Sequence, residues 1–339
     1  MTVRIAIDAM GGDFGPRGAV EGVMNASKLF PYDFLIVGNE RYIQRLLRAR
    51  RFINPSVRIV PSSETVDMGE SPKDSLRKKD SSIAICARLV KEGRADAIIS
   101  AGNTGAVMAA SLFEWRPLPG ISRPAIATLL PSPKHPVVLI DSGANVDCKP
   151  IHLVHFAIMG HCYSHYVLER SRPRIGLLSI GEEETKGNSL TLESHKLLAD
   201  TQLNFRGNAE GRDIISGKFD VIVCDGFVGN VILKFAESVS AMILGSLKGE
   251  ISRNIIARVA AIGVKPAFKN FKKRVDYSEY GGAPLLGLNG TCIICHGISK
   301  SKAFMNAIRV AGEIVNHSLN KHIIEELSKL KGKETGSDE

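Results

Sequence analysis

The stretch VRIAIDAMGGDFGP, residues 3–16, joins a short apolar run to a loop rich in glycine. The run Val3–Asp8 predicts a strand buried on both faces, because nearly all of its side chains are apolar. The loop behind it carries Gly11, Gly12 and Asp13, residue types that are typical of tight turns. A buried strand that ends in a glycine loop is the unit that recurs along this chain.

Seven runs predict such strands, and helical patterns lie between them. The strands are Val3–Asp8, Phe34–Gly38, Ser56–Val60, Ala97–Ala101, Val137–Asp141, Ile175–Ile180 and Asp220–Asp225. The helices are Ser81–Lys91, Gly105–Phe113, Ile151–Leu168, Leu190–Leu198 and Val231–Leu247. This alternation predicts an α/β fold with a parallel sheet covered by helices. We expect one large catalytic domain over residues 1–330 and a disordered tail over residues 331–339.

Five of the strands end in loops that combine glycine with asparagine or aspartate. Ligands of such folds bind beyond the carboxyl ends of the strands. One such loop is typical of an ordinary turn, but five at one end of one sheet predict an anion pocket lined by backbone N–H groups at helix starts. The candidate substrate- and phosphate-binding residues are Gly11, Gly12, Asp13, Gly102, Asn103, Thr104, Gly105, Asn145, Asn188, Asp225 and Gly229.

Common cofactor and nucleophile motifs are missing from the sequence. It has no dinucleotide G-x-G-x-x-G after the first strand, no P-loop, no nucleophile elbow and no histidine pair with zinc-protease spacing. Cys292-Ile-Ile-Cys295-His296 matches a haem-attachment pattern. Its isoleucines favour a core strand instead, and haem attachment of that kind needs export, for which we find no signal. We therefore expect no cofactor and no metal.

The positive charge of the chain is concentrated in one segment. Net charge is 44 − 35 = +9, and residues 248–274 hold eight Lys or Arg against the single acid Glu250, which gives +7. This pattern indicates one anionic partner surface and no nucleic-acid coat. Apolar residues recur on both sides of Gly263 and Pro266, which predicts an amphipathic helical hairpin at about residues 248–275.

Aromatic residues among lysines suit the surface of a membrane. The candidate membrane-binding residues are Ile262, Val264, Lys265, Phe268, Lys269, Phe271, Lys272 and Lys273. The alternative is that this apolar stripe packs on the core or on a second subunit. Without a signal peptide or an unbroken apolar run of about 18 residues, we expect a cytoplasmic protein with no membrane span.

Eight motifs, in order over about residues 3–315, resemble the bacterial phosphate acyltransferases that use acyl-acyl carrier protein. They are IAIDAMGGDFGP (5–16), LRKKDSS (76–82), ISAGNTGAVMA (99–109), DSGANVDCKP (141–150), IGEEETKGN (180–188), GNAEGRDI (207–214), CDGFVGNVILK (224–234) and EYGGAPLLGLNG (279–290). The resemblance implies a Rossmann-like fold related to phosphotransacetylases. It also implies a homodimer that attaches peripherally to the inner face of the cytoplasmic membrane.

The resemblance further implies that an acyl group passes from acyl carrier protein to inorganic phosphate. A membrane glycerol-3-phosphate acyltransferase would then use the acyl phosphate for phospholipid synthesis. The matching motifs place the catalytic residues at Lys186 and Asn230. Since phosphate itself is the nucleophile, a lysine charge and amide donors suffice to stabilise the developing oxyanion.

Several alternatives stay open at the level of sequence. The acyl donor of a phosphotransacetylase-like enzyme would be acyl-coenzyme A. A non-enzymatic scaffold on the membrane surface could bind carrier protein, and a related fold could serve a nicotinamide oxidoreductase. The three carboxylates of Glu182, Glu183 and Glu184 either form a solvated face or position Lys186.

Overall fold

The protein is seen here as a computed structural model that describes residues 2–253, 263, 266 and 279–334. The described strands form one sheet of order β3-β2-β1-β4-β11-β10-β5-β6-β9-β7-β8. Their bounds are β1 Arg4–Asp8, β2 Asp33–Gly38, β3 Val57–Pro61, β4 Ala97–Ser100, β5 Ala125–Leu130, β6 Val137–Ile140, β7 Ile175–Leu178, β8 Phe205–Ala209, β9 Val221–Val223, β10 Ala283–Leu286 and β11 Thr291–Ile294.

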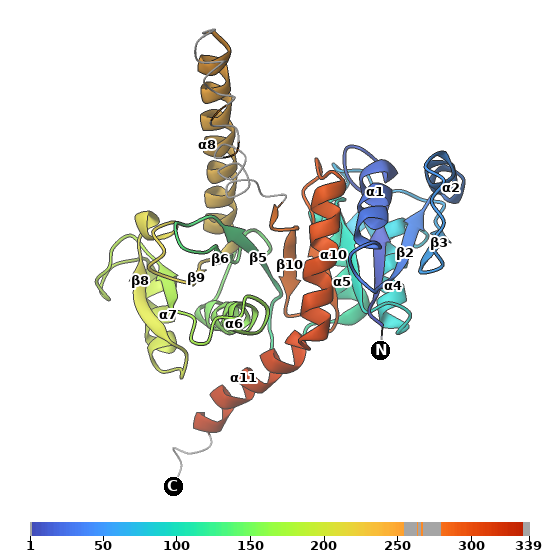
Figure 1. Cartoon of the computed structure of the whole chain (residues 1–339). Helices are drawn as coiled ribbons and strands as arrows, with labels where there is room; N and C mark the ends of the chain where they lie inside the picture. Colours follow the sequence, from blue (N-terminus) through green and yellow to red (C-terminus); the bar gives the residue numbers. More distant parts are fainter. Residues whose placement is uncertain (1, 254–262, 264–265, 267–278, 335–339) are drawn as a thin grey trace.

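Helices cover both faces of this sheet (Figure 1). Their bounds are α1 Pro16–Ala26, α2 Glu40–Ala49, α3 Pro72–Ser75, α4 Ser82–Lys91, α5 Thr104–Trp115, α6 Pro150–Cys162, α7 Ser189–Ala199, α8 Gly226–Arg253, α10 Ser301–Asn316 and α11 Leu319–Glu334. A π-helical turn, η1 Tyr163–Val167, extends α6, and a 3-10 turn, η2 Gly211–Asp213, follows β8. The predicted α/β fold and all seven predicted strands are confirmed.

The strands are buried on both faces because alternate side chains enter different cores. Ile5 and Ile7 of β1 join the cluster of buried residues under α1 and α10, whereas Ala6 joins the cluster under α4 and α5. In β9, Val221 and Val223 face the first of these cores and Ile222 faces a third one. Burial on both faces is the physical reason for the continuous apolar runs.

The direction of the strands changes across the middle of the sheet. Pairing is parallel from β3 to β11 and again from β6 to β8. The pairs β11–β10, β10–β5 and β5–β6 are antiparallel. Three successive reversals make β6, β9, β7 and β8 run opposite to β1–β4. The sheet is therefore mixed, and the expected single parallel array is wrong in this respect. Strands β5 and β10, which cause the reversal, were not predicted.

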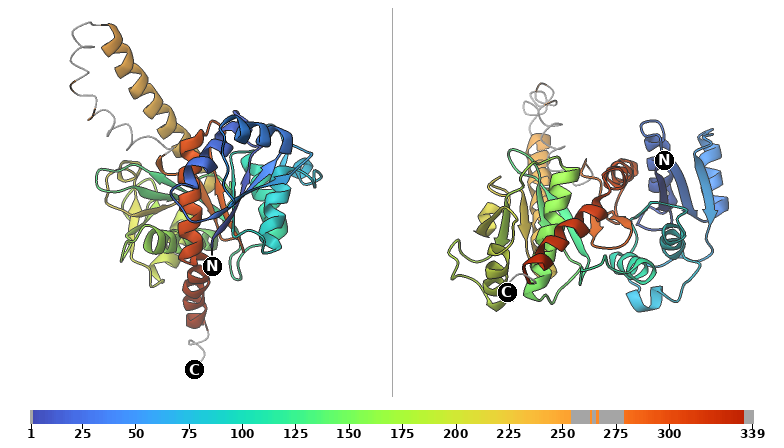
Figure 2. Two further views of the ribbon diagram at one scale, coloured as in Figure 1. Left: turned by 45° about the vertical axis from the view of Figure 1, so that its right-hand side comes forward. Right: turned by 90° about the horizontal axis from the view of Figure 1, so that it is seen from below.

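Two helices link the two halves of the sheet. Helix α10 packs on α1 and β4 in the half that holds β1–β4. Helix α11 crosses to the other half and contacts α6 and η1, with Ile323 and Leu327 buried there (Figure 2). It continues to Glu334, so helix extends into the segment 331–339 that we predicted to be disordered.

Helix α8 projects from the body as a 28-residue rod (Figure 1). It includes the predicted helix Val231–Leu247 and extends it at both ends. By length and composition α8 could cross a membrane, although one such helix is weak support for a span, and only 6% of its most apolar window is buried. Our count of unbroken apolar runs missed it because Lys234 and Glu237, which pair at 2.9 Å, interrupt the sequence. All eight candidate membrane-binding residues lie outside the described residues.

Candidate active site

The loops after β1 and β4 pack together around a buried carboxylate, and we call residues 8–13 and 100–105 the first loop cluster. The fully buried Asp8 ends β1, and its Oδ1 accepts hydrogen bonds from the N–H groups of Met10 and Gly11 at 3.0 and 3.1 Å. Its Oδ2 accepts from Ser100 Oγ at 2.6 Å. The Gly12 backbone lies against Gly297 after β11, whose carbonyl accepts from the Asp13 N–H at 2.8 Å.

Asn103 caps helix α5 at the edge of the first loop cluster. Its Oδ1 accepts from the Ala106 N–H at 3.0 Å, as expected of an N-cap asparagine. Its Nδ2 donates to the carbonyls of Met68 and Glu70 at 2.7 and 2.9 Å. Both polar atoms of the Asn103 side chain are therefore occupied by hydrogen bonds to the backbone. The predicted helix start at Gly102–Gly105 is confirmed. The N–H groups of the first helical turn have no intrahelical acceptor.

The loops after β6, β9 and β7 follow three adjacent parallel strands, and we call residues 141–145, 225–230 and 181–188 the second loop cluster. Asp141 is fully buried at its base. Its carboxylate accepts from the N–H groups of Ile126, Gly143, Ala144 and Asn145 and from Asn145 Nδ2 at 2.7–3.1 Å. Burial raises the pKa of Asp141, and these hydrogen bonds oppose the rise. Asn145 Nδ2 also donates to the Pro124 carbonyl at 2.7 Å.

Helix α8 starts directly on the loop that Asp141 organises. The Gly226 N–H donates to the Asn145 carbonyl at 2.7 Å, and Asp225 Oδ1 accepts from the Val228 N–H at 2.9 Å. A Cβ on Gly229 would lie only 1.9 Å from the Asp141 carbonyl oxygen, so only glycine allows this approach. The next residue, Asn230, is exposed beside Gly143, and its side chain has no hydrogen-bond partner among the described residues.

Lys186 lies in the tight turn after β7. Its N–H donates to the Glu183 carbonyl at 3.0 Å, and its carbonyl accepts from Ser179 Oγ at 3.0 Å. The side chain is exposed and pairs with no described carboxylate. Asn188 caps α7, since its Oδ1 accepts from the Thr191 N–H at 2.9 Å. The structure therefore gives Asn188 a capping role and, within the described part of the chain, leaves the Lys186 amine unpaired.

In the part of the chain that the structure describes, the Lys186 amine pairs with none of the three neighbouring glutamates. Glu182 pairs with Lys218 at 2.9 Å and with Arg212 at 3.7 Å. Glu184 lies 3.7 Å from His195 Nε2 and is 85% exposed. Of the two alternatives for these glutamates, this arrangement favours a solvated face over a role in positioning Lys186.

The predicted site residues thus fall into two clusters. Gly11, Gly12, Asp13 and Gly102–Gly105 belong to the first, and the other predicted loop residues belong to the second with Lys186 and Asn230. Because the two sets of strands run in opposite directions, the expectation of five loops at one end of one sheet is wrong. Sequence reasoning missed the organising residues Asp8 and Asp141, although an acidic residue at the end of an apolar strand was a usable signal.

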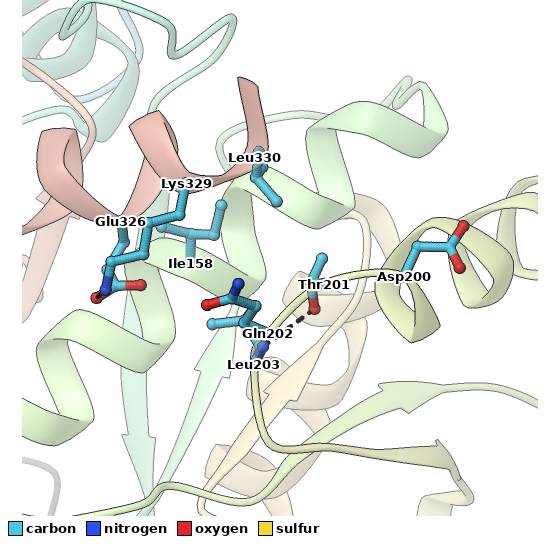
Figure 3. Close-up of a pocket in the computed structure, with 8 residues that line it drawn as sticks. All are labelled: Ile158, Asp200, Thr201, Gln202, Leu203, Glu326, Lys329 and Leu330. Atoms are coloured by element: carbon cyan, nitrogen blue, oxygen red, sulfur yellow. Dashed lines mark hydrogen bonds and ion pairs between the residues drawn. The ribbon is translucent and has the colours of Figure 1, made fainter. Parts of the chain in front are cut away.

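Other groups near the site offer little for catalysis. Burial raises the pKa of the Cys148 thiol, beside Asn145, to about 11, so it stays protonated near neutral pH. In residues 2–253 and 279–334, no group of three or more His, Cys, Asp or Glu could hold a metal ion. The pocket in Figure 3 is lined by residues of α6, the turn after α7 and α11, and by none of the first or second loop cluster. Its volume of about 20 Å³ is room for about one water molecule, too little for a substrate.

The fold resembles those of two kinds of solved enzyme, a phosphotransacetylase and a 4-hydroxythreonine-4-phosphate dehydrogenase. A phosphotransacetylase from Streptococcus pyogenes superposes with a TM-score of 0.60 and 16% identity, covering 95% of this chain and 94% of that one. A 4-hydroxythreonine-4-phosphate dehydrogenase from Klebsiella pneumoniae gives a TM-score of 0.53 and 14% identity, covering 93% and 100%. These likenesses establish the fold alone, and the predicted phosphotransacetylase-like fold is confirmed.

Sequence relatives are much closer. The family model described as "Fatty acid synthesis protein" matches residues 3–322. The phosphate acyltransferase of Aquifex aeolicus (strain VF5) is 49% identical over 329 residues, which covers 97% of this chain and 98% of the relative. The phosphate acyltransferase of Syntrophotalea carbinolica is 48% identical over 95% of this chain and 93% of the relative. On this similarity over nearly its full length, the chain belongs to the phosphate acyltransferase family, and it is an acyltransferase.

Proposed function

We propose that this enzyme transfers a fatty acyl group from acyl-acyl carrier protein to inorganic phosphate and releases acyl phosphate. One observation carries the choice of site. Lys186 and Asn230 are exposed and without partners among the described residues, and they follow the adjacent parallel strands β7 and β9. Around them, the polar side chains of Asp141 and Asn145 are held by hydrogen bonds.

The chemistry needs a positive charge and amide donors rather than a protein nucleophile. A phosphate oxygen attacks the thioester carbonyl carbon, the C–S bond breaks, and the carrier thiolate leaves and takes up a proton. Lys186 and Asn230 would stabilise the oxyanion that develops on the carbonyl oxygen. The start of α5 in the first loop cluster is an alternative phosphate site, where the N–H groups of Thr104 and Gly105 would bind the anion. Phosphate bound there would react only if the thioester carbonyl also lay in the first cluster, so we propose it as the alternative to a site beside Lys186 and Asn230.

Acyl carrier protein is our preferred donor because the family model is described as a fatty acid synthesis protein and the chain is basic overall. The alternative donor is acyl-coenzyme A. A scaffold without activity would leave the exposed Lys186 and Asn230 without a role.

The test is to incubate the protein with phosphate and either acyl-acyl carrier protein or acyl-coenzyme A, trapping acyl phosphate as hydroxamate. We expect phosphate-dependent hydroxamate from the carrier-protein substrate at a kcat/KM at least about tenfold higher. Equal or faster reaction with acyl-coenzyme A would replace the donor. No hydroxamate from either substrate would overturn the proposal.

We propose that two copies pair through helix α8. Phe227, Val231, Phe235 and Met242 lie four, four and seven residues apart, so they share one face of the helix. Phe227, Phe235 and Met242 are 61%, 70% and 62% exposed. A second copy would cover this face, whereas a solitary rod would leave it in water. Sedimentation should show a dimer that Phe235→Glu weakens; a wild-type monomer at micromolar concentration would contradict this.

We further propose that the enzyme is cytoplasmic and attaches peripherally to the inner face of the membrane through the basic segment at about residues 248–275. There it would deliver acyl phosphate to a glycerol-3-phosphate acyltransferase. Seven net charges, each worth about 1 kcal/mol near an anionic surface, support reversible binding. Changing Val264 and Phe268 to Glu should abolish pelleting with anionic vesicles and leave soluble acyl transfer intact. Unchanged pelleting, or loss of the dimer, would favour the alternative of a subunit or core contact.

A further inference from the structure

The turn that carries Lys186 is held in place by hydrogen bonds to its backbone. We call the Glu183 carbonyl, Asn208 and His195, which hydrogen bonds join in this order, the clamp. The Glu183 carbonyl accepts one hydrogen bond from the Lys186 N–H at 3.0 Å and a second from Asn208 Nδ2 at 2.8 Å. Asn208 comes from the neighbouring strand β8 and is 4% exposed. On the other side of the turn, Gly187 has a φ of +132°, and a Cβ there would lie 2.0 Å from Thr191 Oγ1. The backbone around Lys186 is therefore fixed, although its side chain is exposed.

A buried histidine completes the clamp. His195 of α7 is 7% exposed, and its Nδ1 lies 2.9 Å from Asn208 Oδ1. Because Asn208 Nδ2 donates to the Glu183 carbonyl, Oδ1 is the acceptor, and His195 must donate from Nδ1–H. The edge-to-face contact of its ring with Phe205, at 5.1 Å between centroids, fixes the ring plane.

Apolar side chains at these two positions would fill the same space without the cost of burying polar groups. A buried polar pair at these positions is explained if the hydrogen bond that it supplies to the Glu183 carbonyl has a function. We propose that His195 and Asn208 are positioning residues that hold the 183–186 turn, so that the Lys186 amine faces the reacting carbonyl. This inference rests on the proposed role of Lys186. A displacement of about 1 Å in a reacting group costs up to about 10²-fold in rate.

The first test is Asn208→Ala, which removes the donor to the Glu183 carbonyl. We expect kcat to fall about tenfold or more while KM for the acyl donor changes less than about twofold, because the free amine is still present but misplaced. The matched control is Asn204→Ala, which removes the hydrogen bond that Asn204 Nδ2, just before the start of β8, donates to the Arg172 carbonyl. This control should keep wild-type kcat.

Rescue at His195 separates positioning from packing. His195→Asn retains an N–H donor near the Nδ1 position and should recover most of the activity that His195→Leu loses. The ¹⁵N spectrum of the wild-type histidine should also show the Nδ1–H tautomer. If Asn208→Ala fails to fold, the comparison of His195→Asn with His195→Leu still tests the positioning role. Equal activity of the two His195 variants, or an Nε2–H tautomer, would overturn the inference.

A double-mutant cycle with Lys186→Ala shows whether Asn208 acts through the lysine. We expect Asn208→Ala to cause no further loss of kcat when Lys186 is already alanine. A further loss by the full factor would overturn the inference while leaving the proposed function intact. If Lys186→Ala alone kept wild-type turnover, the proposed role of Lys186 would fail and this inference with it.

Discussion

The first and second loop clusters are organised in the same way, but they differ in the side chains that remain without hydrogen-bond partners among the described residues. In each, a buried aspartate at the end of a strand, Asp8 or Asp141, accepts the N–H groups of the loop that follows. The first cluster then uses the Asn103 side chain to cap α5 and hold the chain at Met68 and Glu70. The second leaves Lys186 and Asn230 exposed without partners among the described residues. The exposed side chains of Asp13 and Thr104 in the first cluster also have no partner among the described residues. What distinguishes the second cluster is therefore the unpaired positive charge of Lys186, on which our catalytic proposal rests.

The largest effects should come from the buried aspartates that organise the two clusters. Asp8→Ala leaves two N–H groups and the Ser100 hydroxyl without their acceptor, and Asp141→Ala leaves four N–H groups and Asn145 Nδ2 without theirs. Each change should therefore lower the free energy of unfolding by about 3 kcal/mol. Urea unfolding measures this. Asp225→Ala, which removes only one cap bond at a half-buried site, should cost about 1 kcal/mol. A loss at only one of the two buried aspartates would break the equivalence of the clusters.

The next effect separates the clusters by activity. Lys186→Ala and Asn230→Ala should each lower turnover about 10²-fold, as expected for losing one preorganised group at a developing anion. Their thermal midpoints should stay within about 2 °C of the wild type, since neither side chain has a partner among the described residues. Hydroxamate trapping and thermal scans measure the two quantities. Near-wild-type turnover in both variants would remove the catalytic assignment.

A smaller effect should follow from Asn103→Ala in the first loop cluster. Loss of the α5 cap should lower the free energy of unfolding by about 1–2 kcal/mol, and turnover should fall less than about tenfold. Asn188→Ala, the corresponding cap of α7, should cost about 1 kcal/mol. A hundredfold loss of turnover in Asn103→Ala at unchanged stability would place the chemistry in the first cluster.

Phosphate binding at the start of α5 makes a separate prediction. A Cβ on Gly105 would lie 2.8 Å from Pro72 Cγ, so Gly105→Val should shift the helix start. We expect KM for phosphate to rise about threefold or more and stability to fall by about 1 kcal/mol. Initial rates against phosphate concentration measure the first quantity. An unchanged phosphate KM would restrict the first loop cluster to a structural role.

The smallest effect concerns the pH dependence of stability, which should differ between the two halves of the sheet. Burial lowers the pKa of His155 in α6 to about 4, and it also lowers the pKa of His152 and His161. A histidine whose folded pKa lies below its unfolded value of about 6.5 contributes its full stability above pH 6.5 and loses it as pH falls toward 4. Urea unfolding at pH 7 and pH 5 should show this loss, and His155→Gln should reduce it.

Hydrogen exchange at pH 5 locates the effect. The helices α1, α4, α5 and α10, which cover the other half, carry no histidine. Amides of α6 should therefore lose protection before those of α5. Earlier opening of α5 would contradict this.

The sequence alone determined the local structure and pointed to the pair that we propose as catalytic. Runs such as Ile175–Ile180 are apolar because both faces of the strand are covered, so their composition predicts the strand without its neighbours. Lys186 and Asn230 were proposed from motifs that resemble those of the phosphate acyltransferases. The hydrophobic pattern also located most of α8, because its register depends on residues three and four positions apart.

Only the tertiary structure decided which loops meet. The direction of β6, β9 and β7 depends on the antiparallel pairs through β10 and β5, and β10 lies more than 150 residues beyond β5 along the chain. The clamp of His195 and Asn208 likewise joins a helix, a strand and a turn that no local pattern connects. Strand pairing and buried hydrogen bonds are contacts between distant residues, so their partners are fixed when the core closes rather than by neighbouring residues in the sequence.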